Sequence, residues 1–114
     1  MKFRRGQRVH SEEGTFGTVS NIVVDPEVGD VTHLVVEPET THQHSRLVPV
    51  RLVSVVDEIV KIARGGSYIR QLERVAFEDF VPVSADVDIS SDWDVDDQDL
   101  IAAPPAAAED LNPG

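Results

Sequence analysis

The chain has 114 residues, a formal net charge of −11 at pH 7, and no cysteine. The length suits one small domain plus a tail, and the lack of cysteine excludes disulfide bonds and thiol catalysis. No apolar run approaches the roughly 18 residues that span a bilayer, and the basic N-terminal segment lacks the apolar centre of a signal peptide. We therefore expect a cytoplasmic protein with no membrane contact. Because a core of this size is modest, we also expect a homodimer.

Two runs rich in β-branched residues, 18–24 and 31–36, flank a segment of turn formers. Asp25 can accept backbone hydrogen bonds, Pro26 fixes φ at the next position, and Gly29 supplies a left-handed conformation. This pattern predicts a β-hairpin.

The turn also suggests a register for the hairpin. If Asp25 pairs with Asp30, Ile22 and Val24 share one face of the hairpin with Val31, His33 and Val35. The opposite face is also largely apolar. We therefore expect the hairpin to be covered on one side by a core and on the other by a helix, a neighbouring segment or a partner.

The apolar run 46–56 predicts one strand, or two strands with a break. Pro49 within it belongs at an edge, a strand end or a bulge, because it has no N–H to donate. Asp57 and Glu58 then form a turn, and 59–63 is the expected return strand of a second hairpin.

Residues 67–77 show apolar positions at intervals of three to four residues, which predicts a short amphipathic helix with Ser67 as its N-cap. Residues 78–83 follow as a last strand or a linker. Pro82 argues against a central strand there.

The combination of Gly17, Val19, the segment VDPEVGDVTHLVVE and RLVPVRLV at 46–53 resembles the PRC-barrel domain, a small SH3-like β-barrel. The resemblance covers roughly residues 5–80, about the size of one small domain. We expect a mainly β fold, a barrel of five or six strands with one short helix and an acidic C-terminal tail. The expected organisation is a PRC-barrel-like domain at residues 1–84 and an acidic, Ala/Pro-rich, partly disordered tail at 85–114.

The negative charge is confined to one part of the chain. Residues 1–75 hold ten Lys and Arg against ten Asp and Glu, whereas residues 76–114 hold eleven acids and no Lys or Arg. Such a tail repels nucleic acid and anionic membranes and attracts basic proteins or cations.

The N-terminal segment carries the opposite charge, with Lys2, Arg4, Arg5 and Arg8 close together. One interpretation is a solvated basic strand edge, where charge discourages aggregation. The other is a dock for the acidic tail, within the molecule or between molecules.

Residues 85–101 alternate acids with apolar residues, which is typical both of an edge strand and of a disordered interaction segment. Trp93 is the candidate anchor for a partner, since tryptophan is enriched at interface hot spots. Its alternative role is to fold back over an apolar face of the barrel. The candidate partner-binding acids are Asp92, Asp94, Asp96 and Asp97.

The run of aspartates also raises the question of calcium. Asp97 stands where an EF-hand loop needs glycine, and Ala103 where it needs glutamate. His42, His44 and Glu39 likewise lack a convincing further ligand for zinc. We predict no metal and no cofactor.

No nucleophile elbow, phosphate loop or metal triad is visible, so we predict no enzymatic activity. A charge-neutral barrel with an acidic tail argues against direct binding of nucleic acid. PRC-barrel domains occur in a photosynthetic reaction-centre subunit, in a ribosome-maturation factor and as stand-alone proteins. The resemblance therefore implies a non-catalytic protein-interaction or assembly adaptor, self-associating, whose acidic tail binds a basic partner protein. The alternative is a ribosome-maturation-linked or RNA-associated factor.

Overall fold

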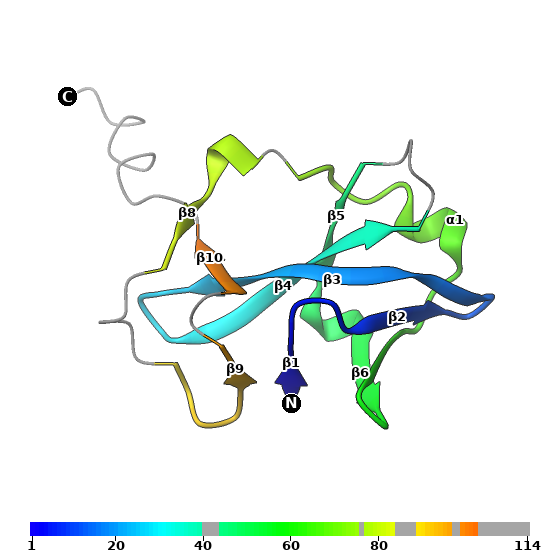
Figure 1. Cartoon of the computed structure of the whole chain (residues 1–114). Helices are drawn as coiled ribbons and strands as arrows, with labels where there is room; N and C mark the ends of the chain where they lie inside the picture. Colours follow the sequence, from blue (N-terminus) through cyan, green and yellow to red (C-terminus); the bar gives the residue numbers. More distant parts are fainter. Residues whose placement is uncertain (40–43, 76, 84–88, 97–98, 103–114) are drawn as a thin grey trace.

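The computed structural model describes residues 1–39, 44–75, 77–83, 89–96 and 99–102. These residues form a mainly β structure, which confirms the prediction at that level (Figure 1). The strands are β1 (Lys2–Phe3), β2 (Arg8–Ser11), β3 (Gly14–Asp25), β4 (Asp30–Pro38), β5 (Arg46–Pro49), β6 (Val53–Val56), β7 (Ile59–Ile62), β8 (Val81–Pro82), β9 (Asp94–Val95) and β10 (Leu100–Ala102). The helical segments are η1 (Val50–Leu52), α1 (Gly66–Ile69) and η2 (Phe77–Asp79).

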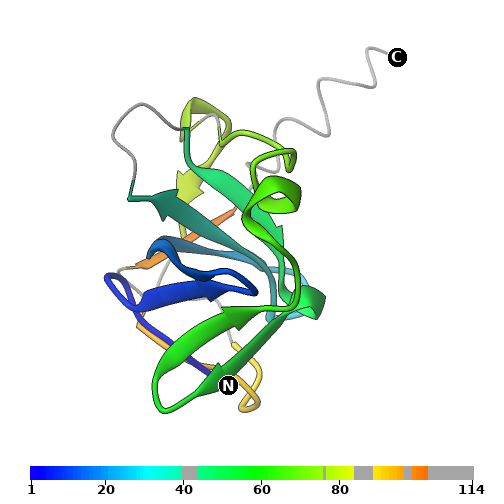
Figure 2. The same ribbon diagram turned by 90° about the vertical axis from the view of Figure 1, so that its right-hand side faces the viewer.

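Six strands follow one another in the main sheet, in the order β5-β4-β3-β2-β7-β6. The β2–β7 pair is parallel, and the other neighbours on this path are antiparallel. The sheet curls strongly, so that its two ends approach the same side of the molecule (Figure 2). Strand β10 joins the sheet beside β3, and β8 pairs with β10.

The predicted first hairpin is present as β3 and β4, and Asp25 pairs with Asp30 as expected. The turn uses the predicted residues. Gly29 has a φ of 74° and donates its N–H to the Asp25 carbonyl oxygen at 2.8 Å. The Asp25 carboxylate accepts the N–H of Glu27 at 3.0 Å. The turn chemistry in the sequence therefore sets where the hairpin reverses.

The predicted face of Ile22 is wrong, because two irregularities shift the pairing by one residue and then restore it. They lie between Val23 and Val24 and between Val19 and Asn21. Between them Ile22 pairs with Leu34, not with His33. An extra residue in one strand turns the side chains that follow it to the opposite face.

Strand β3 is much longer than β2, its antiparallel neighbour on one side. Beyond the end of β2, Val19 of β3 bonds to Gly6 and Gln7 through backbone hydrogen bonds of 2.7 and 2.9 Å. Further along, β10 pairs with β3 in parallel, with Leu100 opposite Ile22. The edge of β3 is thus completed by residues from both ends of the described chain.

The second predicted hairpin is also present, formed by β6 and β7. Asp57 and Glu58 make its two-residue turn and have φ values of 53° and 67°. Two left-handed residues are what a type I′ turn requires. Pro49 is the last residue of β5, one of the positions predicted for it.

The predicted helix at 67–77 is wrong in length and in its cap. Helix α1 is a single turn, and its N-cap is Gly65. The Glu13 carboxylate accepts the N–H of Gly66 at 2.6 Å, so the capping acceptor comes from the β2–β3 turn and not from Ser67. A side chain 53 positions away in the sequence thus accepts the hydrogen bond that a local N-cap residue would otherwise accept.

After α1 the chain becomes extended and borders β5. The Glu73 carbonyl oxygen accepts the N–H of Leu47 at 2.9 Å, and the Ser45 carbonyl oxygen accepts the N–H of Val75 at 3.0 Å. These sheet-like contacts replace the helical hydrogen bonds that the periodicity of the segment suggested. Tertiary pairing thus overrides local helix propensity.

The core lies inside the curl of the sheet and draws on nearly the whole described chain. Phe3, near the N-terminus, and Leu100, near the end of the described residues, are 0% and 2% exposed. The other buried members are Val9, Phe16, Val19, Ile22, Val24, Val31, Leu34, Val36, Val48, Leu52, Val53, Val60, Ile62, Ile69 and Ala102. The buried set therefore includes Leu100 and Ala102, while the division of the chain at residue 84 stays a prediction.

Gly17 gives a test of the β3–β4 pairing. A Cβ atom there would overlap the Glu37 carbonyl group and lie 2.9 Å from the Pro38 Cα. We expect Gly17→Ala to lower the free energy of unfolding by about 2–3 kcal/mol, because the clash is with backbone that cannot rotate away. Denaturant unfolding measures it. Thr18→Ala, a half-exposed neighbour in the same strand, should cost under about 1 kcal/mol. Equal losses in the two variants would contradict the close approach.

Leu100 tests whether the acidic C-terminal segment is part of the folded unit. We expect Leu100→Ala to lower the free energy of unfolding by about 2–4 kcal/mol, because the side chain is buried against the core. Ile101→Ala, a less buried neighbour in β10, should cost less. If Leu100→Ala unfolds at the wild-type denaturant concentration, β10 does not contribute to the core in solution.

Candidate functional site

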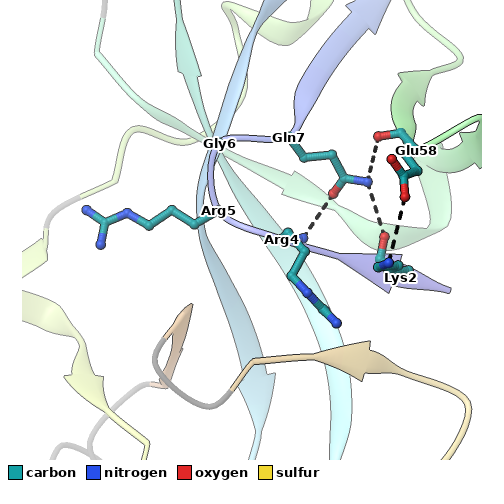
Figure 3. Close-up of a pocket in the computed structure, with 6 residues that line it drawn as sticks. All are labelled: Lys2, Arg4, Arg5, Gly6, Gln7 and Glu58. Carbon is teal, nitrogen blue, oxygen red and sulfur yellow. Dashed lines mark hydrogen bonds and ion pairs between the residues drawn. The ribbon is translucent and has the colours of Figure 1, made fainter.

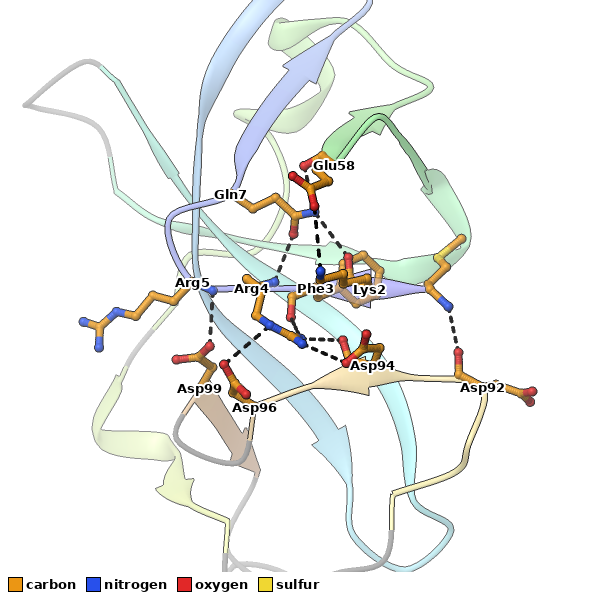
Figure 4. Close-up of polar contacts among 11 residues, drawn as sticks. Lys2, Phe3, Arg4, Arg5, Gln7, Glu58, Asp92, Asp94, Asp96 and Asp99 are labelled. Atoms are coloured by element: carbon orange, nitrogen blue, oxygen red, sulfur yellow. Dashed lines mark hydrogen bonds and ion pairs between the residues drawn. The ribbon is translucent and has the colours of Figure 1, made fainter.

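The acidic strand β9 lies beside the basic strand β1 (Figure 4). The pairing is parallel, with Lys2 opposite Asp94 and Phe3 opposite Val95. The Met1 carbonyl oxygen accepts the Asp94 N–H at 2.8 Å, and the Met1 amino group donates to the Asp92 carbonyl oxygen at 2.7 Å. Of the two roles expected for the basic segment, the structure shows a dock for the acidic segment within the molecule. We call residues 1–5 together with 92–96 and Asp99 the N–C clasp.

Arg4 is the centre of the clasp. Its guanidinium group donates to the Asp94 carboxylate at 2.8 Å and to the Asp94 carbonyl oxygen at 2.8 Å. Its Nε lies 3.5 Å from the Asp96 carboxylate. One side chain thus holds both the backbone and two carboxylates of the acidic segment, which suits the planar, multi-donor guanidinium group.

The pKa values of the clasp follow from this hydrogen bond. The Arg4 donor lowers the pKa of Asp94 below its ordinary value of 3.8, and the same hydrogen bond raises the pKa of Arg4. The Asp94 side chain is 64% exposed and the Arg4 side chain 33%, so water and salt screen their attraction. The ion pair therefore orients the acidic strand more than it stabilises the fold.

Asp99 is the deepest acid of the clasp, at 8% exposure. Its carboxylate accepts the backbone N–H of Arg5 at 3.2 Å, and its own N–H donates to the Asp96 carbonyl oxygen at 3.0 Å. A buried carboxylate needs such a donor, because burial without one is costly. Asp99 links the clasp to Leu100 and so to β10.

Trp93 lies half-buried between the clasp and the β3–β4 hairpin. Its ring stacks on Phe3 with the centroids 6.1 Å apart, and its indole N–H donates to the Asp30 carboxylate at 3.3 Å. It also packs against the core. These contacts fit the role of covering an apolar face, while a role as partner anchor stays a prediction.

The other predicted site residues fall as follows. Asp92, Asp94 and Asp96 are all exposed; Asp94 and Asp96 both contact Arg4, whereas the Asp92 side chain points away from β1 (Figure 4). Asp97 lies outside the described residues. Binding of a partner by these acids stays a prediction. The hydrogen bond between Trp93 and Asp30 was not predicted from the sequence. The alternation of acidic and apolar residues around Trp93 carries no information about a partner 63 positions away.

A shallow pocket of about 330 Å³ borders the clasp (Figure 3). Gln7 occupies its centre: the side-chain amide donates to the carbonyl oxygens of Glu58 at 2.9 Å and Lys2 at 3.2 Å, and accepts the N–H of Arg4 at 3.0 Å. Lys2 also forms an exposed ion pair with Glu58 at 3.7 Å. The polar groups of the pocket thus tie β1 to the β6–β7 turn. Arg5 points away from this network.

Of the three residues considered as zinc ligands, the structure describes two. His44 and Glu39 are exposed, and His42 lies outside the described residues. In the part of the chain that the structure describes, no group of three or more His, Cys, Asp or Glu is placed to hold a metal ion. None of the described helices is long and apolar enough to cross a membrane.

Comparison with known proteins does not assign this chain to a family. No model of a known protein family matches it, and no curated protein is significantly similar to it. The PRC-barrel resemblance therefore stays a prediction.

Acid should open the clasp. The folded-state pKa of Asp94 is lowered, so its contribution is present above the unfolded value of 3.8 and is lost as pH falls through the folded value. Trp93 is the only tryptophan of the chain. We expect its fluorescence below about pH 4 to shift towards that of an exposed indole, because the acidic segment loses its attachment to Arg4 while the contacts of Trp93 with the core remain. In Asp94→Asn at neutral pH the emission should already be shifted part of the way.

His33 provides the control for this titration, because burial lowers its pKa from 6.5. Its neutral form is favoured in the folded state, so its contribution is lost as pH falls below 6.5. In His33→Gln, the loss of stability between pH 6.5 and pH 5 should shrink. The change in Trp93 fluorescence below pH 4 should persist in this variant. A single transition, unaffected by Asp94→Asn, would contradict a clasp that titrates through Asp94.

Proposed function

We propose that the protein is a non-catalytic adaptor that self-associates and binds a basic segment of a partner protein through its acidic strand. The observation that supports this is the exposure of Asp94, in the docked strand β9, and of Asp96, directly after that strand. Their side chains are 64% and 56% exposed although both contact Arg4. Carboxylates that are already positioned lose little conformational entropy when they bind a cation.

The described acids of the clasp are not all held in ion pairs, although its cations (the N-terminal amino group, Lys2, Arg4 and Arg5) equal them in number. These acids are Asp92, Asp94, Asp96 and Asp99. Arg4 makes ion pairs with two of them, and Lys2 makes its ion pair with Glu58. The net charge of −11 of the whole chain favours a partner that brings Lys or Arg.

The partner binds on the solvent side of β9, and β1 keeps its place. Phe3 of β1 is fully buried, and displacing it would expose an aromatic side chain. Asp92 is exposed and its side chain points away from β1 (Figure 4). The basic segment of the partner thus meets Asp92, Asp94 and Asp96 from outside the clasp.

The finer fold assignment belongs to the same proposal. We infer an SH3-like barrel of the PRC type, from the DPEVGD turn between β3 and β4, the Val48-Pro49 pair at the end of β5, and the curled path of six strands. Adaptor domains commonly bind through surface segments carried on such a rigid β framework.

The experiment uses the full chain, because ending it at residue 84 would remove buried Leu100. A synthetic Arg- and Lys-rich peptide is titrated against the protein at low and high salt, with binding followed by calorimetry. We expect binding at low salt that weakens at high salt. Asp92→Asn combined with Asp96→Asn should weaken it about three- to tenfold, the loss of two exposed charge contacts.

The matched control is Glu37→Gln combined with Glu39→Gln, which removes the same charge from an exposed surface elsewhere. This variant should bind the peptide as the wild type does. If both double variants lose equal affinity, attraction is set by net charge alone and the acidic strand is not the site. Tight binding of single-stranded RNA by the wild type, with no binding of the peptide, would favour the RNA-associated alternative.

A further inference from the structure

The main sheet has two end strands, and their outer edges differ. The outer edge of β5 is bordered by residues 73–75, with Arg46 bridging to Arg74. Strand β6, at the other end, pairs with β7 alone among the described residues. An edge strand of this kind offers its outward N–H and C=O groups to another strand.

The hairpin geometry tells which groups point outward. With a two-residue turn at Asp57 and Glu58, Val56 and Ile59 form the closing hydrogen-bonded pair, and bonding alternates from there. The hydrogen bond from the Ala63 N–H to the Leu52 carbonyl oxygen, at 3.0 Å, fits this alternation. Val53 and Val55 therefore direct their backbone groups away from β7. The Val53 N–H is already bonded to the Val50 carbonyl oxygen.

The side chains of β6 do nothing to protect this edge. The strand reads Val-Ser-Val-Val, without the Lys, Pro or bulge that usually blunts an edge strand. Val56 is 46% exposed on its outer face. The hairpin of β6 and β7 lies at the margin of the sheet, where its turn projects from the body (green in Figure 2).

Charge at the two ends of β6 favours a second copy of the chain as the occupant. Arg51 precedes the strand and Asp57 follows it, and both are exposed. If two β6 strands pair antiparallel about a two-fold axis at Ser54, the end of β6 next to Arg51 in each copy lies beside the end next to Asp57 in the other, with Arg51 in η1 and Asp57 in the β6–β7 turn. In the same register Val55 of each copy faces Val53 of the other, so that outward backbone groups meet. Opposite charges across a strand pair stabilise it.

We propose that the protein forms a two-fold dimer by antiparallel pairing of β6 with β6 of a second copy, centred on Ser54. This inference deepens the self-association in the proposed function and rests on it. The Val55 N–H donates to the Val53 carbonyl oxygen of the other copy, twice by symmetry, and joins the two curled sheets into one. Such an interface is isologous: each copy contributes the same strand.

The interface is small, so the dimer is weak. One four-residue edge strand lies below the area of standard stable interfaces, and we expect a dissociation constant of about 10–100 μM. Sedimentation velocity of the full chain, from low micromolar to about 1 mM, covers this range.

Two kinds of variant locate the interface. Val55→Pro removes the outward N–H and should raise the dissociation constant about tenfold or more. Arg51→Glu and Asp57→Arg each bring like charges close to one another at both ends of the paired strands and should also weaken the dimer about tenfold. Arg51→Glu combined with Asp57→Arg restores opposite charges and should recover most of the wild-type affinity. Thermal melting of each variant shows that the fold is retained.

The outcomes separate this inference from the proposed function. A chain that stays monomeric to about 1 mM overturns both the β6 dimer and self-association, while peptide binding by the acidic strand is judged by its own titration. A dimer unaffected by Val55→Pro and by both charge reversals leaves self-association standing and overturns the β6 interface. Weakening by each single reversal, with recovery in the double variant, supports antiparallel two-fold pairing of the two β6 strands.

Discussion

The structure depends on how one edge of strand β3, which the hairpins alone leave without hydrogen-bond partners, is completed. Strand β3 has 12 residues and β2 has four, so much of one side of β3 would lack hydrogen-bond partners if the hairpin strands were the whole sheet. Buried N–H and C=O groups must be paired, and here the pairing comes from Gly6 and Gln7 on one side of the gap and from β10 on the other. The positions of the N-terminal and acidic segments follow from this need. The clasp between them forms where the two segments that complete β3 meet.

Ion pairs and backbone hydrogen bonds have different roles in this molecule. The excess of carboxylates in residues 76–114 would repel itself if it gathered without cations. Arg4 reduces that repulsion locally and fixes the direction of β9, while the apolar contacts of Phe3 and Trp93 supply the burial. Because the ion pairs are exposed, they can orient carboxylates without immobilising them in a dry site. That combination is what makes an acidic strand suited to reversible contacts with basic segments.

How far the sequence predicts this structure depends on the range of the interaction. The β3–β4 turn was predictable because Asp25 and Gly29 act on their own neighbours, and the β6–β7 hairpin for the same reason. The face of Ile22 was not, since a bulge is set by packing across the pair. The helix at 67–77 was overestimated because a sheet edge competes for the same backbone groups. In the site, opposite charge suggested a dock, but neither the partner of Trp93 nor the role of Asp99 is visible in local pattern.

The parallel pairing of β1 with β9 and of β10 with β3 has a consequence for how the chain reaches its native state. Residues separated by more than 75 positions must meet before the edge of β3 is complete, which is a slow, non-local step. During synthesis the N-terminal hairpins emerge first, and the edge of β3 stays incomplete until the acidic segment follows. Until residues 100–102 arrive, part of an apolar strand stays open to other chains. The concentration of negative charge in the last third of the sequence then acts on a nascent molecule as well, since like charges keep unfinished copies apart.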